Sequence, residues 1–354
     1  MTIGTGLWYP APCSVAVFRA LNLGDLLCSV PALRALRLAL PDARITLIGL
    51  HSAIPVVERF KHYVDELLLF PGDPAFPEQA VRMEDLSGFY GKVRARNFDL
   101  ILQMHGSGAQ SNDVVRRMGG RRWAGFVPEE SLQEPGRLMA WPDHLPEIHR
   151  YLALLSYLGL PSTDTALEFP LRDEDRREAD AAADNAGLDL DRTIFIHPGA
   201  RMASRRWPLD RFAGVMQRLA GQSWQLAVTG SPDEAELAAG LIRRAGTQAA
   251  NLSGKTSLGA LVSMLQRGRM LVCNDTGISH LAAAVRLPSV VIASGSDVAR
   301  WAPLDTGLHR VLHTPMPCRP CSYFDCPIGH PCALGISVGQ VMEQAQLQLG
   351  AIHE

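Results

Sequence analysis

The sequence predicts an α/β protein built from two doubly wound halves, each a mainly parallel sheet with helices on both faces. Short apolar runs alternate with segments whose apolar residues recur at helical spacing, which is typical of strand–helix–strand units. A charged stretch near residue 170 interrupts the alternation, which then begins again. Small polar motifs follow several apolar runs, and doubly wound sheets bind ligands at the carboxyl ends of their strands.

The first half begins with a strand at 14–20 (SVAVFRA), which the turn sequence LNLGD connects to a helix at 26–40. The tripeptide PDA ends this helix, and a second strand follows at 44–50 (RITLIGL). A further strand is expected at 98–105 (FDLILQMH), and apolar spacing predicts an amphipathic helix at 147–160. Together these elements predict a βαβ unit and therefore a parallel sheet.

The second half shows the same alternation, with polar or glycine-containing turns after its strands. Strands are expected at 193–200, 224–230, 269–275 and 289–295, and helices at 209–222, 231–246, 256–268 and after residue 276. We expect an N-terminal domain over 1–170, a C-terminal domain over 171–335, and a last helix within 336–354 that packs back on the N-terminal domain.

Charge and composition limit the class of protein. Hydrophobic residues make up 47% of the 354 residues, which is enough for two separate cores. The 34 Lys and Arg nearly balance the 36 Asp and Glu, so a net charge of -2 gives no overall attraction to nucleic acid or an anionic membrane. No apolar run approaches the roughly 18 residues of a membrane span, and the N-terminus lacks the basic region of a signal peptide. We expect a cytoplasmic protein with at most peripheral contact with the inner face of the membrane.

The seven cysteines fall into two groups. Four of them lie in the sequence CRPCSYFDCPIGHPC, at positions 318, 321, 326 and 332. Three interpretations stay open for Cys318, Cys321, Cys326 and Cys332: a structural metal site beyond the ligand-binding motifs, a reduced packed loop, or a redox-labile pair. The others, Cys13, Cys28 and Cys273, are expected in the core.

Several motifs carry residues suited to binding or catalysis. Asp25, in LGD, is either a helix cap or a general base. Arg205 and Arg206, in SRRWP, are either a solvated pair or cations that offset the charge of a leaving group. Thr276 and Gly277 begin a helix whose free N–H groups favour an anion, although the carboxylate of Asp275 precedes them.

Four motifs, LGD, HPG…RRWP, TGSPDE and DTGxSH, occur in one order over about residues 14–304 and together resemble glycosyltransferase family 9. This family comprises the ADP-heptose:lipopolysaccharide heptosyltransferases. The resemblance implies the GT-B fold, in which two Rossmann-like domains face a central cleft. It also implies transfer of heptose, with inversion, from ADP-heptose to a hydroxyl of the lipopolysaccharide inner core, without a catalytic metal or other cofactor.

The resemblance assigns roles to individual residues. Asp25 is the general base, and Arg205 offsets the charge of the departing ADP. Asp275 would face sugar hydroxyls and also cap its own helix. The donor site comprises Gly24, Gly199, Ala200, Arg206, Glu234, Thr256, Asp275, Thr276, Gly277 and His280. A phosphorylated glycolipid acceptor is expected to contact His105, Gln110, Arg116, Arg117, Arg121 and Arg122.

Three alternatives stay open. A nucleotide-sugar epimerase can share this architecture, but it needs no acceptor site, so the arginines at 116–122 favour a transferase. A binding protein without activity would not need Asp25, Arg205 and Asp275 together. A member of the same family that uses another nucleotide sugar or another acceptor would carry the same motifs.

Overall fold

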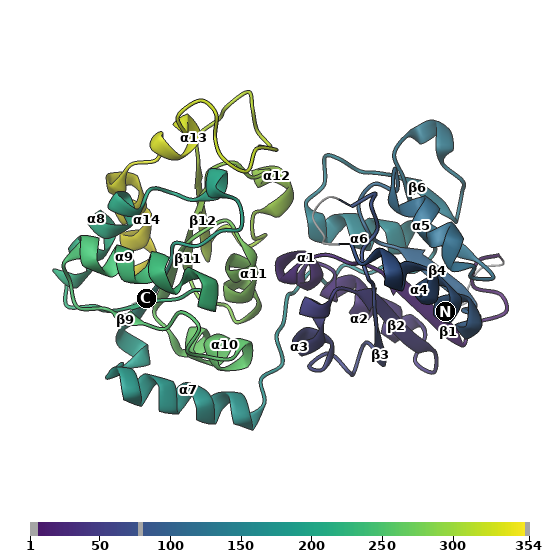
Figure 1. Ribbon diagram of the computed structural model, residues 1–354, viewed down its shortest axis with the longest axis horizontal. Coiled ribbons are helices and arrows are strands. Elements are labelled where there is room, and N and C mark those ends of the chain that lie inside the picture. The colour runs from purple at the N-terminus through teal and green to yellow at the C-terminus, as the bar shows by residue number, and fades with distance from the viewer. Residues whose placement is uncertain (1–5, 77–80, 351–354) are drawn as a thin grey trace. The chain divides into compact units, whose positions relative to one another are not determined.

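The computed structural model describes residues 6–76 and 81–350. The chain divides into two compact units, Met1–Ala166 and Leu167–Glu354. Each unit contains one six-stranded parallel sheet with helices packed on both faces (Figure 1). The two doubly wound halves predicted from the sequence are therefore confirmed.

The sheet of the N-terminal unit has the order β3-β2-β1-β4-β5-β6. Its strands are β1 (Ser14–Phe18), β2 (Arg44–Gly49), β3 (Glu66–Leu69), β4 (Leu100–Gln103), β5 (Trp123–Val127) and β6 (Leu138–Ala140). Its α-helices are α1 (Leu23–Leu27), α2 (Val30–Ala39), α3 (Ile54–Val57), α4 (Met83–Arg96), α5 (Ser111–Met118) and α6 (Glu147–Tyr157). Two 3-10 turns, η1 (His51–Ala53) and η2 (Glu130–Leu132), join these elements.

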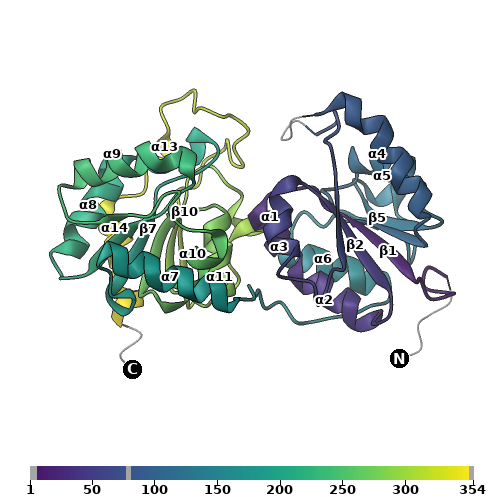
Figure 2. The same cartoon turned by 60° about the horizontal axis from the view of Figure 1, so that its bottom comes forward.

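Helices cover both faces of this sheet, which explains why its central strands are almost continuously apolar. Helices α4 and α5 pack on one face, where Phe89, Val93 and Val115 meet Phe18 and Ile101. Helices α2 and α6 pack against each other on the other face (Figure 2). Strands β1 and β4 are therefore enclosed, and their carboxyl ends are held in place by packing on both sides.

The sheet of the C-terminal unit has the order β12-β11-β10-β7-β8-β9. Its strands are β7 (Thr193–His197), β8 (Gln225–Val228), β9 (Ala250–Asn251), β10 (Met270–Asn274), β11 (Ser289–Ala293) and β12 (His309–His313). Its α-helices are α7 (Asp173–Ala186), α8 (Leu209–Ala220), α9 (Ala235–Ala245), α10 (Leu258–Arg267), α11 (Gly277–Ala284), α12 (Val298–Trp301), α13 (Pro331–Leu334) and α14 (Val338–Gly350). Three 3-10 turns complete the unit: η3 (Leu190–Arg192), η4 (Ala203–Arg205) and η5 (Pro232–Glu234).

The last helix packs differently from the prediction. Side chains of α14, among them Val341, Met342 and Ala345, join the core formed by α8, α9 and the C-terminal sheet. The expectation that this helix packs back on the N-terminal domain is corrected. The apolar side of α14 is buried within its own unit, against α8, β10 and β11.

The helix predicted at 26–40 is two helices. Helix α1 already begins at Leu23, and α2 begins at Val30 with Pro31 in its first turn. Proline lacks the N–H that would continue a helix and is well accommodated at a helix start. The LGD motif therefore lies in a five-residue helix rather than in an open turn.

Each sheet reverses its strand order beside its first strand, between β1 and β4 in one unit and between β7 and β10 in the other. Such switch points are where doubly wound sheets bind ligands. Over the described ranges, 6–76 and 81–350, no helix combines the length and the apolar character that crossing a bilayer requires.

Candidate active site

Asp25 lies beyond the carboxyl end of β1, next to the switch point of the N-terminal sheet. It is the acidic residue of the first turn of α1, and its side chain is half-buried. Its backbone carbonyl accepts a hydrogen bond from Nε of Arg19 at 2.8 Å. Arg19 follows β1 directly and is buried, and the sequence analysis did not single it out. An arginine inside an apolar strand run was the available signal, because a fully buried guanidinium needs dedicated partners.

The carboxyl edge of the C-terminal sheet gathers the second group of motifs at its switch point. Asn274, the last residue of β10, is completely buried. Its Nδ2 donates to the carbonyl of Pro198 at 2.7 Å, and its Oδ1 accepts from the backbone N–H of Trp207 at 2.9 Å. One amide therefore joins the NDTG, HPG and RRWP motifs. The sequence analysis missed Asn274, although a polar residue at the end of an apolar strand was the signal.

The turn after β7 brings its backbone close to the side chain of Glu234. Gly199 and Ala200 are both buried. A Cβ on Gly199 would lie 2.5 Å from Cδ of Glu234 and closer still to one of its carboxylate oxygens, so any larger residue would force this carboxylate to move. Glu234 is fixed in turn, because its Oε2 accepts from the backbone N–H of Ser231 at 2.9 Å and from its hydroxyl at 3.2 Å. Glu234 thus acts as the capping-box residue of η5, and its carboxylate lies against the HPG turn.

His197 lies beside this carboxylate. Its Nδ1 is 3.0 Å from the hydroxyl of Thr229. Burial lowers the pKa of His197, and the negative charge of Glu234 opposes part of that shift. The imidazole is therefore neutral and held by a hydrogen bond, which suits a positioning role at the end of β7.

The two arginines of SRRWP differ in their contacts. Nε of Arg206 donates to the carbonyl of Ala200 at 2.8 Å, so this side chain closes the HPG turn. Arg205 ends η4 and is half-buried, and its Nε is buried without a hydrogen-bond partner among the described residues. A buried unpaired donor is costly, so Arg205 is the side chain of this pair that would gain most from an anionic ligand.

Helix α11 begins at Gly277, with Thr276 in an extended conformation at the N-cap. No side-chain hydrogen bond caps this helix, so the suggestion that Asp275 caps it is corrected. Asp275 is buried, and its backbone N–H donates to the carbonyl of Ile292 at 3.0 Å. His280 is buried one turn further on, with its ring 6.4 Å from that of Trp301. The first N–H groups of α11 are therefore not used by a cap.

Thr256 lies in the segment between β9 and α10 and is half-buried. The neighbouring Ser257 caps α10 through a hydrogen bond from the backbone of Ala260 at 3.2 Å. Glu178 of α7 accepts from Ser257 at 2.7 Å and 2.6 Å and fixes this segment further. Thr256 is thus carried by a rigid helix start at the carboxyl edge of the sheet.

The family model for glycosyltransferase family 9 (heptosyltransferase) matches residues 89–330, which is more than half of the chain. The chain belongs to this family. It is 24% identical over 304 residues to lipopolysaccharide heptosyltransferase 3 of Escherichia coli K12, covering 79% of this chain and 82% of that protein. The protein is therefore a glycosyltransferase of the lipopolysaccharide heptosyltransferase family, which excludes the epimerase and the inactive binding protein as its class.

Solved structures agree with the GT-B fold of the transferase. A glycosyltransferase family 9 protein from Veillonella parvula matches with a TM-score of 0.76 at 22% identity, covering 95% of this chain and 97% of that chain. The ADP-heptose lipopolysaccharide heptosyltransferase II of Escherichia coli matches with a TM-score of 0.72 at 19% identity, covering 96% and 100%.

The cysteine loop of the transferase, residues 314–330, packs directly on the donor-side motifs. Its backbone carbonyl at Phe324 accepts from the N–H of Ser204 at 2.8 Å, and Nε2 of His330 lies 2.7 Å from the carbonyl of Ser204. The N–H of Cys321 donates to the carbonyl of Gly295 at 2.7 Å. The expectation that this region lies beyond those motifs is corrected, because it holds the residue next to Arg205.

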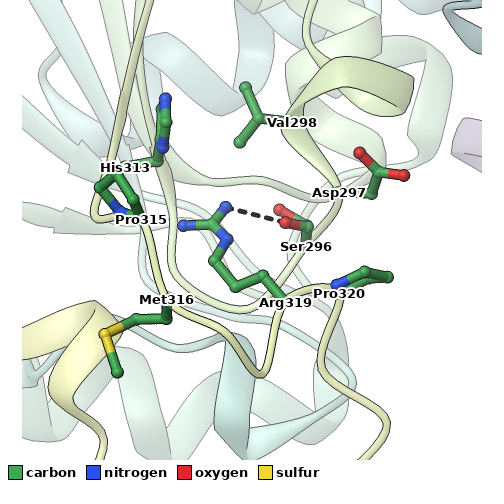
Figure 3. Close-up of a pocket in the computed structure, with 8 residues that line it drawn as sticks. All are labelled: Ser296, Asp297, Val298, His313, Pro315, Met316, Arg319 and Pro320. Atoms are coloured by element: carbon green, nitrogen blue, oxygen red, sulfur yellow. Dashed lines mark hydrogen bonds between the residues drawn. The ribbon is translucent and has the colours of Figure 1, made fainter. Parts of the chain in front are cut away.

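A pocket of about 280 Å³ lies between this loop and the end of β11 (Figure 3). The guanidinium of Arg319 projects into it between His313 and Ser296, and one Nη donates to the carbonyl of Ser296 at 2.8 Å. Burial lowers the pKa of Arg319, while nearby negative groups, Asp275 among them, oppose the shift. Arg319 is a polar side chain near the donor motifs that the sequence analysis did not single out.

The thiols do not form a metal-binding arrangement. Within the part of the chain that the structure describes, no group of three or more His, Cys, Asp or Glu side chains is placed to hold a metal ion. Cys332 is buried and Sγ of Cys326 accepts from the N–H of His330 at 3.2 Å, as a packed loop requires, whereas Cys318 is exposed. Cys28 and Cys273 are buried as expected, whereas Cys13 is exposed just before β1.

The arginines proposed for the acceptor are separated by the fold. Arg121 and Arg122 precede β5 and lie at the amino end of the parallel sheet, whereas Asp25 follows β1 at the carboxyl end. Arg122 donates to the carbonyls of Leu7 and Tyr9, at 2.6 Å and 3.1 Å. The prediction is therefore corrected for Arg121 and Arg122, which brace the start of the chain and β5 away from Asp25.

Arg116 and Arg117 lie in the last turn of α5. Arg117 donates to Asp73 at 2.7 Å and stacks 4.9 Å from the ring centre of Tyr90. Arg116 pairs with Asp113 at 2.7 Å, and both of those side chains are exposed. Arg116 is more exposed than Arg117, but its guanidinium carbon lies 5.4 Å from the ring centre of Trp123, the first residue of β5, so it too lies near the amino end of the sheet.

His105 and Gln110 flank the loop after β4. His105 is buried against Phe18 and Phe76, and its Nδ1 accepts from the N–H of Ala20 at 3.2 Å. Burial, helped by the charge of Arg19, lowers the pKa of His105 to about 3. The side chain of His105 packs in the core, which leaves little of it exposed for the predicted contact with the acceptor. Gln110 is exposed at the N-cap of α5.

Proposed function

We propose that the protein transfers heptose from ADP-heptose to a hydroxyl of the lipopolysaccharide inner core, with inversion at the anomeric carbon. The observation that carries the proposal is the clustering of the HPG, RRWP and NDTG motifs around Asn274 at the β7/β10 switch point. The names of the relatives support the sugar and the acceptor, because they are lipopolysaccharide heptosyltransferases.

The donor site follows from the free polar groups at this edge. The uncapped start of α11, with Thr276 and Gly277, offers N–H groups to the diphosphate. Arg205 supplies a cation as negative charge develops on the departing ADP, assisted by Arg206. Asp275 accepts hydrogen bonds from sugar hydroxyls. Gly24, Gly199, Ala200, Glu234, Thr256 and His280 complete the proposed donor contacts.

Asp25 is the proposed general base. The acceptor hydroxyl oxygen attacks the anomeric carbon while its proton passes to the Asp25 carboxylate. The bond between the anomeric carbon and the phosphate oxygen breaks, and ADP leaves with the electron pair. General-base catalysis contributes typically about 10²–10⁴ in rate. The charge of ADP is balanced by arginine and backbone N–H groups, so the proposed reaction uses no catalytic metal or other cofactor.

The acceptor is proposed to be a phosphorylated glycolipid that contacts Gln110, which is exposed at the N-cap of α5, after the carboxyl end of β4. We place the reaction in the cytoplasm, with at most peripheral contact between the protein and the inner face of the membrane.

The test is ADP release from ADP-heptose, with and without a heptose-deficient lipopolysaccharide core. We expect acceptor-dependent release that falls at least about 100-fold in Asp25→Asn and in Arg205→Gln. The exposed Asp184→Asn and Arg218→Gln serve as matched controls that remove the same charges elsewhere. Failure to bind ADP-heptose, or full activity of Asp25→Asn, would reject the proposal. Turnover with a different nucleotide sugar or acceptor would assign another substrate within the family.

A further inference from the structure

Arg19 is a charged residue in the interior of the N-terminal unit. It directly follows β1, its backbone N–H donates to the carbonyl of Ile48 at 3.0 Å, and only 1% of the residue is exposed. Its guanidinium is the centre of a hydrogen-bond network. Nη1 donates to the carbonyl of Met104 at 2.8 Å and also to the hydroxyl of Tyr151. Both Nε, at 2.8 Å, and Nη2 donate to the backbone carbonyl of Asp25.

The carbonyl of Asp25 lies where the helical hydrogen bonds change register. The N–H of Cys28 donates to Gly24 at 3.1 Å, but the next N–H, that of Ser29, donates to Leu26 at 3.0 Å. Neither of these two hydrogen bonds ends at the carbonyl of Asp25, which accepts hydrogen bonds from the Arg19 guanidinium instead. Helix α1 has only five residues and no side-chain bond at its N-cap. So short a helix is not stable by itself, and its geometry therefore depends on tertiary contacts such as this one.

The guanidinium is itself fixed from α6. Glu147, which is also buried, lies 3.4 Å from Nη2 of Arg19 and accepts a hydrogen bond from Tyr151. The Arg19 guanidinium carbon stacks 4.3 Å from the ring centre of Tyr151. Arg150 lies 3.5 Å from the other oxygen of Glu147 and donates to the carbonyl of Leu145 at 2.8 Å. The position of Arg19 is thus determined by β1, β4 and α6 together.

Stability alone does not explain why a buried network of charged side chains is present here. Buried ion pairs are often no more stabilising than apolar side chains of similar volume, because desolvation offsets their attraction. Burial disfavours the charge on Arg19, but Tyr151, Glu147 and Asp25 together outweigh burial and raise the pKa of Arg19. The guanidinium is therefore permanently charged, planar and held with its donors aimed at one carbonyl.

We propose that Arg19 is a positioning residue for the transfer reaction: it fixes the backbone of Asp25, and so directs the Asp25 carboxylate toward the acceptor hydroxyl. This inference rests on the proposed role of Asp25 as the general base. Displacing a reacting group by about 1 Å can cost about 100-fold in rate, so a loose α1 would slow proton transfer without preventing donor binding.

The test compares Arg19→Lys with a matched control, Arg37→Lys, in the full chain. Arg37 also donates to backbone carbonyls, those of Pro41 and Ala43, and pairs with Asp65 at 2.6 Å, but it lies before β2 at the other edge of the sheet. Lysine keeps the charge at both sites and removes the planar fork. Acceptor-dependent ADP release gives kcat and the KM for ADP-heptose, and thermal unfolding reports stability.

For Arg19→Lys we expect kcat to fall about 10- to 100-fold, with a KM for ADP-heptose within about twofold of wild type, because the proposed donor contacts lie mostly in the C-terminal unit. Arg37→Lys should keep its kcat even where its loss of thermal stability is similar. A milder variant, Tyr151→Phe, keeps the ring and removes the hydroxyl that donates to Glu147, and it should show a smaller fall in kcat.

The outcomes separate this inference from the proposed function. A wild-type kcat in Arg19→Lys, or equal losses of kcat in Arg19→Lys and Arg37→Lys, would overturn the positioning role. Full activity of Asp25→Asn would instead reject Asp25 as the base. Where Asp25→Asn is impaired, adding Arg19→Lys should cause little further loss, since Arg19 acts through Asp25. Additive losses would contradict the proposal.

Discussion

Asn274 gives the sharpest test of how the donor-side motifs are held together. Replacing Asn274 by Ala removes two short hydrogen bonds, from Nδ2 to Pro198 and from the N–H of Trp207 to Oδ1. Pro198 and Trp207 are both buried, so each released backbone group stays away from water. Each such unpaired group costs about 1–3 kcal/mol, which gives a total loss of about 2–6 kcal/mol in the free energy of unfolding.

The assay for Asn274→Ala is urea unfolding, followed by Trp fluorescence, together with calorimetric titration of ADP. We expect ADP to bind at least about tenfold more weakly, because the HPG and RRWP segments lose their common anchor. Asn112→Ala is the control: Asn112 is a buried amide in the other unit that donates one hydrogen bond, to the carbonyl of Phe126 at 2.9 Å. Its loss should be smaller and should leave ADP binding intact. An Asn274→Ala protein within 1 kcal/mol of wild type, or with unchanged ADP affinity, would refute the reasoning.

Three further predictions follow from single features of the structure. Gly199→Ala forces the Glu234 carboxylate out of its capping box and should lower the free energy of unfolding by about 1–2 kcal/mol. In a Glu234→Ala background the same substitution should have little further effect on thermal unfolding. Additive losses of stability in the double variant would contradict a steric cause. The pKa of His105 is about 3 in the folded state, below the usual value of 6.5. Between pH 6.5 and about 3 the imidazole is therefore protonated in the unfolded chain but neutral in the folded protein. Stability should fall as pH drops through this range, and His105→Phe should show a smaller change in urea midpoint between pH 7.5 and 4.5 than wild type. Exposed Cys318 should react with iodoacetamide in the native protein, whereas Cys273, which is buried and has a raised thiol pKa, should react only after unfolding. Equal labelling of the two cysteines in the native protein, measured by mass spectrometry, would show that Cys273 is not buried.

The sequence predicted every interior strand of the two sheets except β5, because most interior strands are apolar runs. The strand cores VAVF and MLVC are apolar because helices cover both of their faces. The four edge strands β3, β6, β9 and β12, of two to five residues, were missed because they are short and carry little apolar pattern. The interior strand β5 was also missed, because its run WAGFV follows the arginines at 121–122 and includes a glycine. Motifs at strand ends could be placed at a carboxyl edge from local order alone, since parallel strands share that edge.

The side-chain partners could not be predicted in the same way. Arg116, Arg121 and Arg122 look like an acceptor site in the sequence, yet they lie around the start of β5, at the opposite end of the parallel sheet from Asp25. His105 looks like a loop residue that follows a strand, but it stacks on Phe18 in the core.

The sequence by itself determined the family, the two doubly wound halves and the order of the motifs along the chain, because these depend on local pattern and residue type. Only the tertiary structure decided which buried groups meet: Arg19 with the carbonyl of Asp25, Asn274 with Pro198 and Trp207, and the cysteine loop with Ser204. These contacts join residues that no sequence period connects. They form because a polar group enclosed by packing must find its partner in whichever element the fold brings beside it.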